Sequence, residues 1–553
     1  MTCRHGYFRC SRLSPVAEVA PFRHSTFGSF VAVVVAIVVA LLSAIDLTDA
    51  RAADGDSQTP WLAPAREIDR RLEAFWRERG VEPAAEAEPV ELVRRLTLDL
   101  AGRIPTRAEW EAYVKDPAKR DAARDEAIRR LLDGPEFALH WGAQFDEQLQ
   151  GPLAGNAEFV DYLRRRLQAR RPWSEIFREL MLGPWDTDDS KPAVKFLDAR
   201  ARDVDRLTVD ATRAFFAVDI SCARCHDHPL VDEWKQDHYY GMASFFNRTT
   251  GDKGKVNEKT EGDVSFKTRD GQQKTAKPMF LSGRTLDDPA PPAKPSRREQ
   301  LVRAALDDGQ FLARAVVNRV WQTLLSRGLV EPIDQLHTGN PPAVPGLLEW
   351  LADDFIASGY DLRRLVGAVA SCRAYRLSSV STDDRAAQFA AAPLRPLSRR
   401  QFAMSLVVAA GRVDLDFASP IEQRTARASG SPGLARTARY LEAEEKAAAI
   451  VARLDVSGDA FANSTDSLFL ANGGPVADLF RAADGTLAAR LAQQTDDKKA
   501  VDAAVREILS RPPTPAELDS LVKWLETPGA ERARACEQLV WALAMSAEFR
   551  FNH

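Results

Sequence analysis

Two cysteines and a histidine at short spacing are the residues of this 553-residue chain with the clearest chemical potential. Cys222 and Cys225 are separated by two residues, and His226 follows directly. Cys-x-x-Cys-His is the attachment pattern of c-type haem. The two thiols can reach the two vinyl groups on one porphyrin edge, and the adjoining imidazole is placed to coordinate the iron. The spacing therefore predicts one covalent haem c, with His226 as the proximal ligand.

Two other kinds of site fit the same residues. An exported Cys-x-x-Cys pair can form a disulfide or a redox centre, although the βαβ context of thioredoxin-like sites is missing here. Zinc or another transition metal would use both cysteines together with histidines from a nearby set, namely His226, His228 and His238. The residues alone therefore leave haem, a non-haem metal and a disulfide open.

The distal ligand of a haem iron would come from residues that follow the motif. Met242 and His238 lie at a distance that a returning helix can bridge, and both Met and His are known axial ligands. His228 is too near His226 to reach the opposite face of the same haem. We expect it to orient a ligand, or to be a metal ligand itself if the group is not haem.

Helices must position this segment, because apolar and charged residues alternate at helical spacing from residue 61 to 247. Leu92, Leu96 and Leu100, for example, form one apolar stripe. Residues 248–297 are rich in Gly, Lys, Asp and Pro and break this pattern. Two short apolar runs there, 264–266 and 279–281, are separated by Asp-Gly and predict a small β-hairpin.

Together these patterns predict a mainly α protein with two helical domains. The first is an N-terminal cytochrome-c-like domain over residues 62–250. A loop and β-hairpin insertion with a linker follows over 251–297, and the helical patterns then return in a C-terminal domain over 298–553.

A faint internal similarity connects the two ends of this body. Residues 103–109 and 511–517 both carry Arg, Pro, Thr, Ala and Glu at matching positions, and Glu-Phe follows downstream in each case. Helix-capping chemistry alone would produce Pro-Thr-x-x-Glu. We favour that interpretation over two copies of a helical hairpin.

The first 53 residues have the character of an export signal. Four arginines precede an uncharged apolar run over residues 27–45, and Ala-Arg-Ala at 50–52 offers small residues for a signal peptidase. The run is also long enough to span a bilayer. We expect residues 1–53 to be a signal peptide or an N-terminal anchor, which would be the chain's only membrane contact. Either places the protein in the periplasm or cell envelope, or outside the cell.

Composition and motif searches exclude some function classes. The chain has 75 Lys and Arg against 79 Asp and Glu, so no basic surplus favours a nucleic-acid partner. Hydrophobic residues make up 45%, an ordinary value for globular proteins. The nucleophile-elbow, Walker, zinc-protease and dinucleotide-binding patterns do not occur.

The residues around the motif resemble a large secreted family first noticed in planctomycete genomes. The resemblance includes residues 222–247, with Trp234 and the Tyr-Tyr-Gly run that begins at Tyr239. It continues through Leu-Thr-Leu-Asp-Leu at 96–100, Arg-Val-Trp at 319–321 and the closing residues 546–553. Family members pair a cytochrome-like domain of unknown function (1549) with a second one (1553).

The resemblance implies roles for some single residues. The family pattern commonly continues His-Asp/Asn-His-Pro, which residues 226–229 match. An acidic residue is frequent at the position of His238 and Leu at that of Met242, which argues against either as an essential ligand. Cys372 stands where Ser is usual, so we expect a buried small side chain there rather than a reactive thiol.

We therefore expect an exported cell-envelope protein that binds haem c and passes electrons to an unidentified redox partner, with the C-terminal domain as a docking module. The alternative is an envelope binding or structural protein with a zinc-like metal or a disulfide at the Cys/His segment. A third possibility is a metal-dependent hydrolase of an extracellular polymer.

Overall fold

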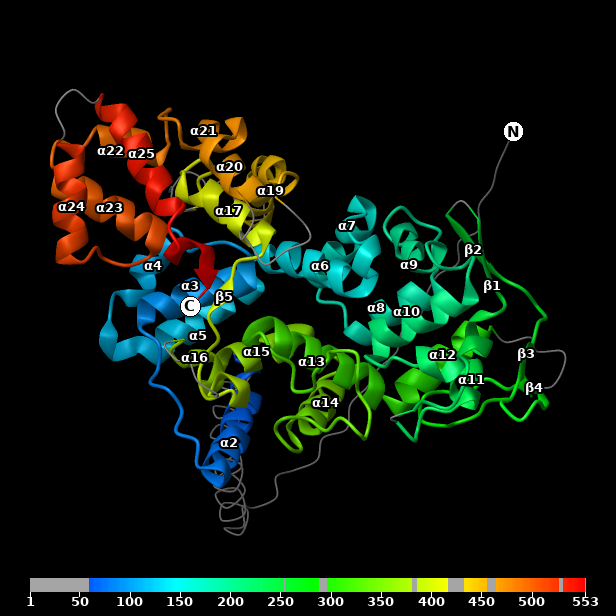
Figure 1. Ribbon diagram of the computed structural model, residues 1–553. Helices are drawn as coiled ribbons and strands as arrows, with labels where there is room; N and C mark the ends of the chain where they lie inside the picture. Colours follow the sequence, from blue (N-terminus) through cyan, green and yellow to red (C-terminus); the bar gives the residue numbers. More distant parts are fainter. Residues whose placement is uncertain are drawn as a thin grey trace, which may run out of the picture. The chain divides into compact units, whose positions relative to one another are not determined.

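The computed structural model describes residues 59–229, 231–252, 254–287, 296–379, 385–415, 432–454, 464–526 and 531–552 (Figure 1). It confirms the mainly α class, with a small β insertion after the first group of helices. The predicted signal peptide or anchor at 1–53 lies outside the described residues. Across the described ranges, no helix combines the length and the apolar character that crossing a membrane requires.

The first group of helices alternates with short 3₁₀ turns. They are α2 (Leu62–Arg79), α3 (Pro89–Ala101), α4 (Arg107–Val114), η1 (Pro117–Lys119), α5 (Arg120–Asp133), α6 (Pro135–Gln150), η2 (Gly151–Leu153), α7 (Ala157–Gln168), α8 (Trp173–Leu182), η3 (Lys191–Val194), α9 (Lys195–Asp198), α10 (Val204–Phe216), η4 (Ser221–Arg224) and α11 (Gln236–Phe246).

The insertion contains two antiparallel hairpins, and helices then resume. The strands are β1 (Thr249–Asp252), β2 (Lys255–Glu258), β3 (Val264–Lys267) and β4 (Gln273–Ala276). The later elements are α12 (Arg297–Asp308), α13 (Gln310–Leu325), α14 (Leu347–Ala357), α15 (Leu362–Ser371), α16 (Arg373–Arg376), η5 (Ala386–Gln388), β5 (Arg395–Pro396), α17 (Arg399–Ala409), α19 (Pro432–Val451), α20 (Ser464–Asn472), α21 (Gly474–Phe480), α22 (Leu487–Ala492), α23 (Asp497–Leu509), α24 (Pro515–Leu525), α25 (Arg532–Ala544), η6 (Glu548–Arg550) and β6 (Phe551–Asn552).

The predicted hairpin forms with a different second strand. β3 pairs with β4, so that Val264 lies opposite Ala276. The expected partner at 279–281 instead contributes Phe280 and Leu281 to the core, where both are buried. The reason is the turn: Gly271 adopts a positive φ of 88° and reverses the chain at once. The residues directly after the turn therefore pair, although they are polar.

Both hydrophobic cores draw on helices from either side of the insertion. The larger core contains side chains from Trp61 to Ala390. The smaller one gathers Leu98, Ile104 and Leu139 of the first group with side chains from α17 to the end of the chain. Residues 59–553 consequently form one compact unit.

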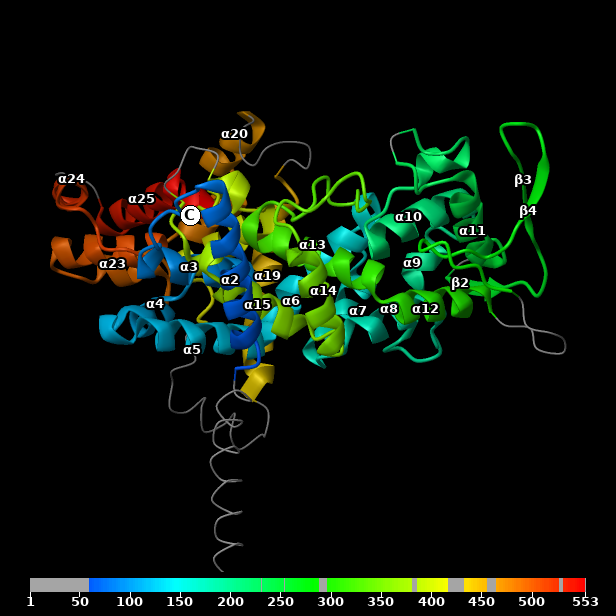
Figure 2. The same cartoon turned by 90° about the horizontal axis from the view of Figure 1, so that it is seen from below.

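One buried carboxylate connects three distant segments in this unit. Asp99 on α3 receives both Oδ contacts from Arg395 at 2.6 Å, and the hydroxyl of Tyr375 donates to it at 2.8 Å. The side-chain amide of Asn552, in the last strand, donates to the same carboxylate at 2.9 Å. The end of the chain, where β5 pairs with β6, is thereby fastened to α3 (Figures 1 and 2).

The internal similarity extends beyond helix capping. Thr106 and Glu109 form the expected capping box at α4, and Thr514 and Glu517 form the same box at α24. In both copies an arginine preceding the box also makes two hydrogen bonds to the boxed glutamate. Arg103 donates to Glu109 at 2.7 and 2.9 Å, and the second copy shows 2.9 and 2.8 Å.

A second glutamate completes each copy. Glu136 at the start of α6 lies 3.5 Å from Arg103, and Glu548 accepts from Arg511 at 2.6 Å. Capping needs neither the arginine nor this second acid. The expected capping boxes are thus present in both segments, and the shared Arg–Glu contacts extend the similarity beyond capping.

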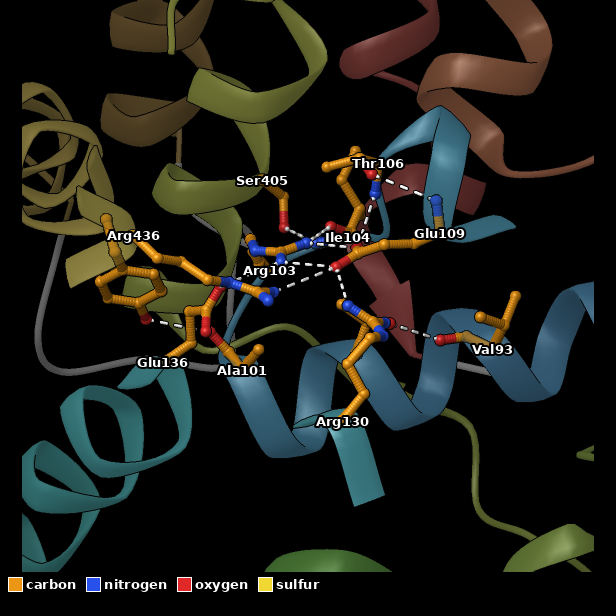
Figure 3. Close-up of polar contacts among 12 residues, drawn as sticks. Val93, Ala101, Arg103, Ile104, Thr106, Glu109, Arg130, Glu136, Ser405 and Arg436 are labelled. Carbon is orange, nitrogen blue, oxygen red and sulfur yellow. Dashed lines mark hydrogen bonds and ion pairs between the residues drawn. The ribbon is translucent and has the colours of Figure 1, made fainter. Parts of the chain in front are cut away.

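The two copies differ in burial. In the first, residues 101–106 are all buried, and Arg130 and Arg436 add to the cluster around Glu109 and Glu136 (Figure 3). In the second, residues 511–514 are exposed or half-buried. The side chain of Glu109 is 8% exposed, whereas that of Glu517 is 38% exposed. The same arginine–glutamate ion pair thus occurs once in the interior of the protein and once near its surface.

This pair allows a matched test of the buried ion cluster. Burial opposes ionisation of Glu109, but Arg103 and Arg130 hold its pKa well below the usual value. A lowered pKa stabilises the fold above the unfolded-state pKa, and this contribution is lost as the pH falls. We expect Glu109→Gln to cost about 3 kcal/mol at pH 7, because it leaves arginines buried without their partner.

The measurement is the free energy of unfolding in urea between pH 7 and pH 3. The difference between wild type and Glu109→Gln should narrow as the pH falls. Arg511 likewise lowers the pKa of Glu517, to about 2, but water screens this pair. Glu517→Gln is the control and should cost much less; equal losses at both sites would contradict this account of burial.

Candidate functional site

The Cys-x-x-Cys-His segment lies on a short turn after α10. Ala217 ends that helix in a left-handed conformation, with φ of 52°, and η4 follows. The Asp219 carboxylate begins the turn by accepting the backbone N–H of Ser221 at 2.9 Å and a contact from Arg213 at 2.6 Å. Burial opposes ionisation of Asp219, but these two partners lower its pKa.

Both thiols of the motif are free and exposed. Ala223, between them, has no exposed surface and packs into the larger core. One buried residue therefore anchors the turn and leaves Cys222 and Cys225 open to a group bound outside it. Cys372 is free and fully buried, as expected, and burial raises its thiol pKa to about 12.

The imidazole of His226 is exposed and held in one orientation. Its Nδ1 lies 2.7 Å from the backbone carbonyl oxygen of Asp227. A carbonyl oxygen only accepts, so Nδ1 carries a proton, and in the neutral ring Nε2 is then the nitrogen with the lone pair. Metal-bound histidines usually show this arrangement, with one ring nitrogen on a carbonyl and the other on the metal.

Helix α11 fastens the loop that carries the motif. The side-chain amide of Gln236 donates to the carbonyl of Cys225 at 3.1 Å, and its backbone N–H donates to the Asp227 carboxylate at 3.0 Å. The hydroxyl of Tyr240 donates to the carbonyl of Arg224 at 3.0 Å. These bonds hold the backbone on both sides of the motif without occupying the thiols or Nε2.

Helix α13 and the segment that follows it also hold the loop that carries the motif. Arg319 on α13 donates to the carbonyls of Ala214 and Arg213, which end α10, and burial lowers its pKa to about 10. The N–H of Leu336 donates to the carbonyl of Ala217 at 3.0 Å. Sequence reasoning missed this role of Arg319, which appeared only as part of the Arg-Val-Trp resemblance.

The two candidate distal ligands have other environments. Met242 on α11 has no exposed surface, so its sulfur would reach an iron at the exposed motif only if α11 rearranged. His238 accepts the N–H of Lys235 at its Nδ1, at 3.4 Å, and meets Trp234 edge to face. Burial lowers the pKa of His238. Both residues thus have packing or hydrogen-bond contacts of their own within the structure.

The zinc-type ligand set is likewise not assembled. Within the described ranges, no group of three or more His, Cys, Asp and Glu side chains lies close enough to hold a metal ion. His228 is half-buried, and its backbone N–H donates to the carbonyl of Trp234 at 2.7 Å.

A cavity of 750 Å³ lies beside His226. Its walls come from the start of α11 and from the β3–β4 turn, which lie side by side in Figures 1 and 2. Phe266 of β3 stacks on Tyr240 of α11 with ring centroids 4.1 Å apart, which holds the two walls together. Its charged lining is balanced between bases and acids, namely Lys235, Arg269 and Lys274 against Asp227, Asp237 and Asp270. Lys274 lies 3.3 Å from Asp237 and pairs with it.

These features fit a covalently attached haem. The two exposed thiols precede His226, and His226 itself lines a space of the size of a ligand pocket. Of the basic side chains in the lining, Lys235 and Arg269 could pair with propionates. The walls are polar, so a porphyrin held here stays in contact with water. Solvent exposure is one of the factors that set the reduction potential of such a group.

Comparison with known proteins returns two family matches and nothing more specific. Residues 67–251 match a family described as "Protein of unknown function (DUF1549)". Residues 297–525 match one described as "Protein of unknown function (DUF1553)". No curated protein and no solved structure matches. The motif lies in the first match and Arg319 in the second, which confirms the resemblance seen in the sequence.

The burial of the thiols predicts two reactivity classes in the protein without haem or metal. Iodoacetamide should modify Cys222 and Cys225 more than about tenfold faster than Cys372 and Cys536, because the last two are buried. Peptide mapping by mass spectrometry after timed labelling measures this difference. Rapid labelling of Cys372 would contradict the packing, and labelling of the motif only after reduction would reveal a disulfide.

Proposed function

Since the chain belongs to a two-domain family in which the domain of unknown function 1549 precedes domain 1553, we propose that it is an exported protein that binds haem c and transfers electrons in the cell envelope. Cys222 and Cys225 form the thioethers, and His226 is the proximal ligand. When bound, the haem supplies one-electron chemistry.

The orientation of His226 is the observation that carries this proposal. The Cys-x-x-Cys-His spacing does not by itself determine how the imidazole is oriented. A coordinating imidazole also needs a nitrogen lone pair that points away from the protein. The carbonyl oxygen of Asp227 supplies that condition by accepting a hydrogen bond from Nδ1–H at 2.7 Å, which leaves Nε2 of the neutral ring as the coordinating atom. The exposed thiols on either side of buried Ala223 complete the set of reactive groups.

The surrounding residues have separate tasks in this proposal. Gln236 and Tyr240 hold the loop backbone through the carbonyls of Cys225 and Arg224, which would fix the position of His226 as a haem ligand. Lys235 and Arg269 would supply positive charge for two propionates, because Lys274 is paired with Asp237. The open side of the cavity lets a redox partner approach closely, which electron transfer requires.

The experiment is an absorption spectrum of the chain from a host that exports it and attaches haem c, repeated after denaturation in alkaline pyridine. We expect a reduced haemochrome band of the c type that stays with the denatured chain, because the thioether bonds are covalent. Cys222→Ala/Cys225→Ala should lose more than about nine-tenths of the band. A reversible redox wave of the intact protein tests the electron-transfer part.

Cys372→Ala is the matched control, since it removes a buried thiol and should keep the haem. A colourless wild-type chain from that competent host overturns the haem proposal. Elemental analysis of the same sample then separates the alternatives: one zinc or other metal per chain indicates a metal-binding envelope protein, and no metal indicates a disulfide or purely structural segment.

A further inference from the structure

A second, smaller cavity lies far along the chain from the Cys/His motif and is lined by polar side chains. Its volume is 290 Å³. Helix α6 contributes His140, Gln144 and Gln148 from one face, at a spacing of four residues. The opposite walls come from α3, α13, β5 and α17, so both matched families contribute. We call it the polar cavity.

A polar stripe on such a deeply packed helix needs an explanation. Most of α6 is buried, and a buried polar group costs free energy unless it is hydrogen-bonded. His140 is 1% exposed, and its buried Nδ1 makes no hydrogen bond. Its Nδ1 edge faces Gly102, where a Cβ would approach within 2.4 Å, which leaves the Nε2 edge for the cavity.

His140 is also neutral at ordinary pH. Burial, together with the nearby Arg400 and Arg164, lowers its pKa to about 3. A neutral imidazole has one donor and one acceptor, so Nε2 can serve a hydroxyl in either role.

Gln148 presents a second unused group. Its amide nitrogen donates to the hydroxyl of Thr323 at 3.2 Å, and that hydroxyl in turn donates to the carbonyl of Arg319 at 2.8 Å. The orientation of the amide is therefore set. Its Oε1 is buried and has no partner, so it remains as an acceptor for a donor inside the cavity.

The charged pair in the wall is already neutralised. Arg395 donates from Nη2 to the Asp99 carboxylate and from Nη1 to the carbonyl of Thr323, each at 2.6 Å. Tyr375 and Asn552 occupy the same carboxylate. The remaining lining groups are amides, a hydroxyl and an imidazole, none of which carries charge. A charged ligand would find no countercharge here.

We propose that the polar cavity binds one neutral, hydroxyl-rich group of the size of a single sugar residue. Each hydroxyl both donates and accepts, as His140, Gln144 and Gln148 together require. The volume lies at the lower end of the range for ligand pockets, too small for a porphyrin-sized ligand. This binding function is independent of haem, and it gives the region that joins the two family domains a ligand of its own.

The test is saturation-transfer NMR on the full chain with neutral monosaccharides, namely glucose, galactose, mannose, xylose and fucose. Glucosamine and galacturonic acid are the charged comparison at equal concentration. We expect at least one neutral sugar to bind and the charged ones to bind at least tenfold more weakly. Gln148→Met should weaken binding at least tenfold, because it removes the unpartnered acceptor without reducing side-chain volume.

Gln272→Met, on the exposed β3–β4 turn, is the control and should bind as wild type does. Gln144→Met provides a second lining variant if Gln148→Met does not fold, as judged by its melting temperature. Binding should persist in Cys222→Ala/Cys225→Ala, which separates this proposal from the haem. The proposal is overturned if no neutral sugar binds, if charged sugars bind equally, or if a folded lining variant binds as tightly as wild type. A cavity that holds only ordered water would give the first of these results.

Discussion

The buried carboxylate of Asp99 is the interaction on which most of the architecture depends. A carboxylate without exposed surface must be fully paired, because leaving it uncompensated costs several kcal/mol. Its partners come from β5, α16 and the last strand, and its own backbone carbonyl accepts the indole N–H of Trp141 on α6. One charge thereby determines how helices from both ends of the sequence pack.

Helix α13 connects the partners of Asp99 to the Cys-x-x-Cys-His motif. Near its C-terminal end, the carbonyl of Thr323 receives Arg395, the partner of Asp99. One turn earlier, the buried Arg319 supports the end of α10, after which the Cys-x-x-Cys-His turn begins. The polar cavity and the thiol turn are thus built on the same helix, and neither is a property of one family domain alone.

Structural features that depend on residues close in sequence could be predicted from the sequence. Contacts between residues distant in sequence could not. The capping box of Thr106 and Glu109, the helical texture and the buried Cys372 were all predicted correctly. The predicted partner strand of β3, at 279–281, was wrong. The prediction gave more weight to the apolar character of these residues than to the position of the turn. Arg319 and the partners of Asp99 were missed, because each contact joins residues about a hundred or more positions apart and no local pattern encodes it.

The packing of α3 against the end of the chain has a consequence for biosynthesis. The guanidinium of Arg94, on α3, donates to the carbonyl of Phe549 at 2.9 Å and lies over its ring. A ribosome delivers residue 94 long before residue 549. Helix α3 is therefore synthesised long before the groups that complete its packing, and contacts of such sequence separation form slowly. During that interval the Cys-x-x-Cys-His turn is already synthesised while the structure around it is still open.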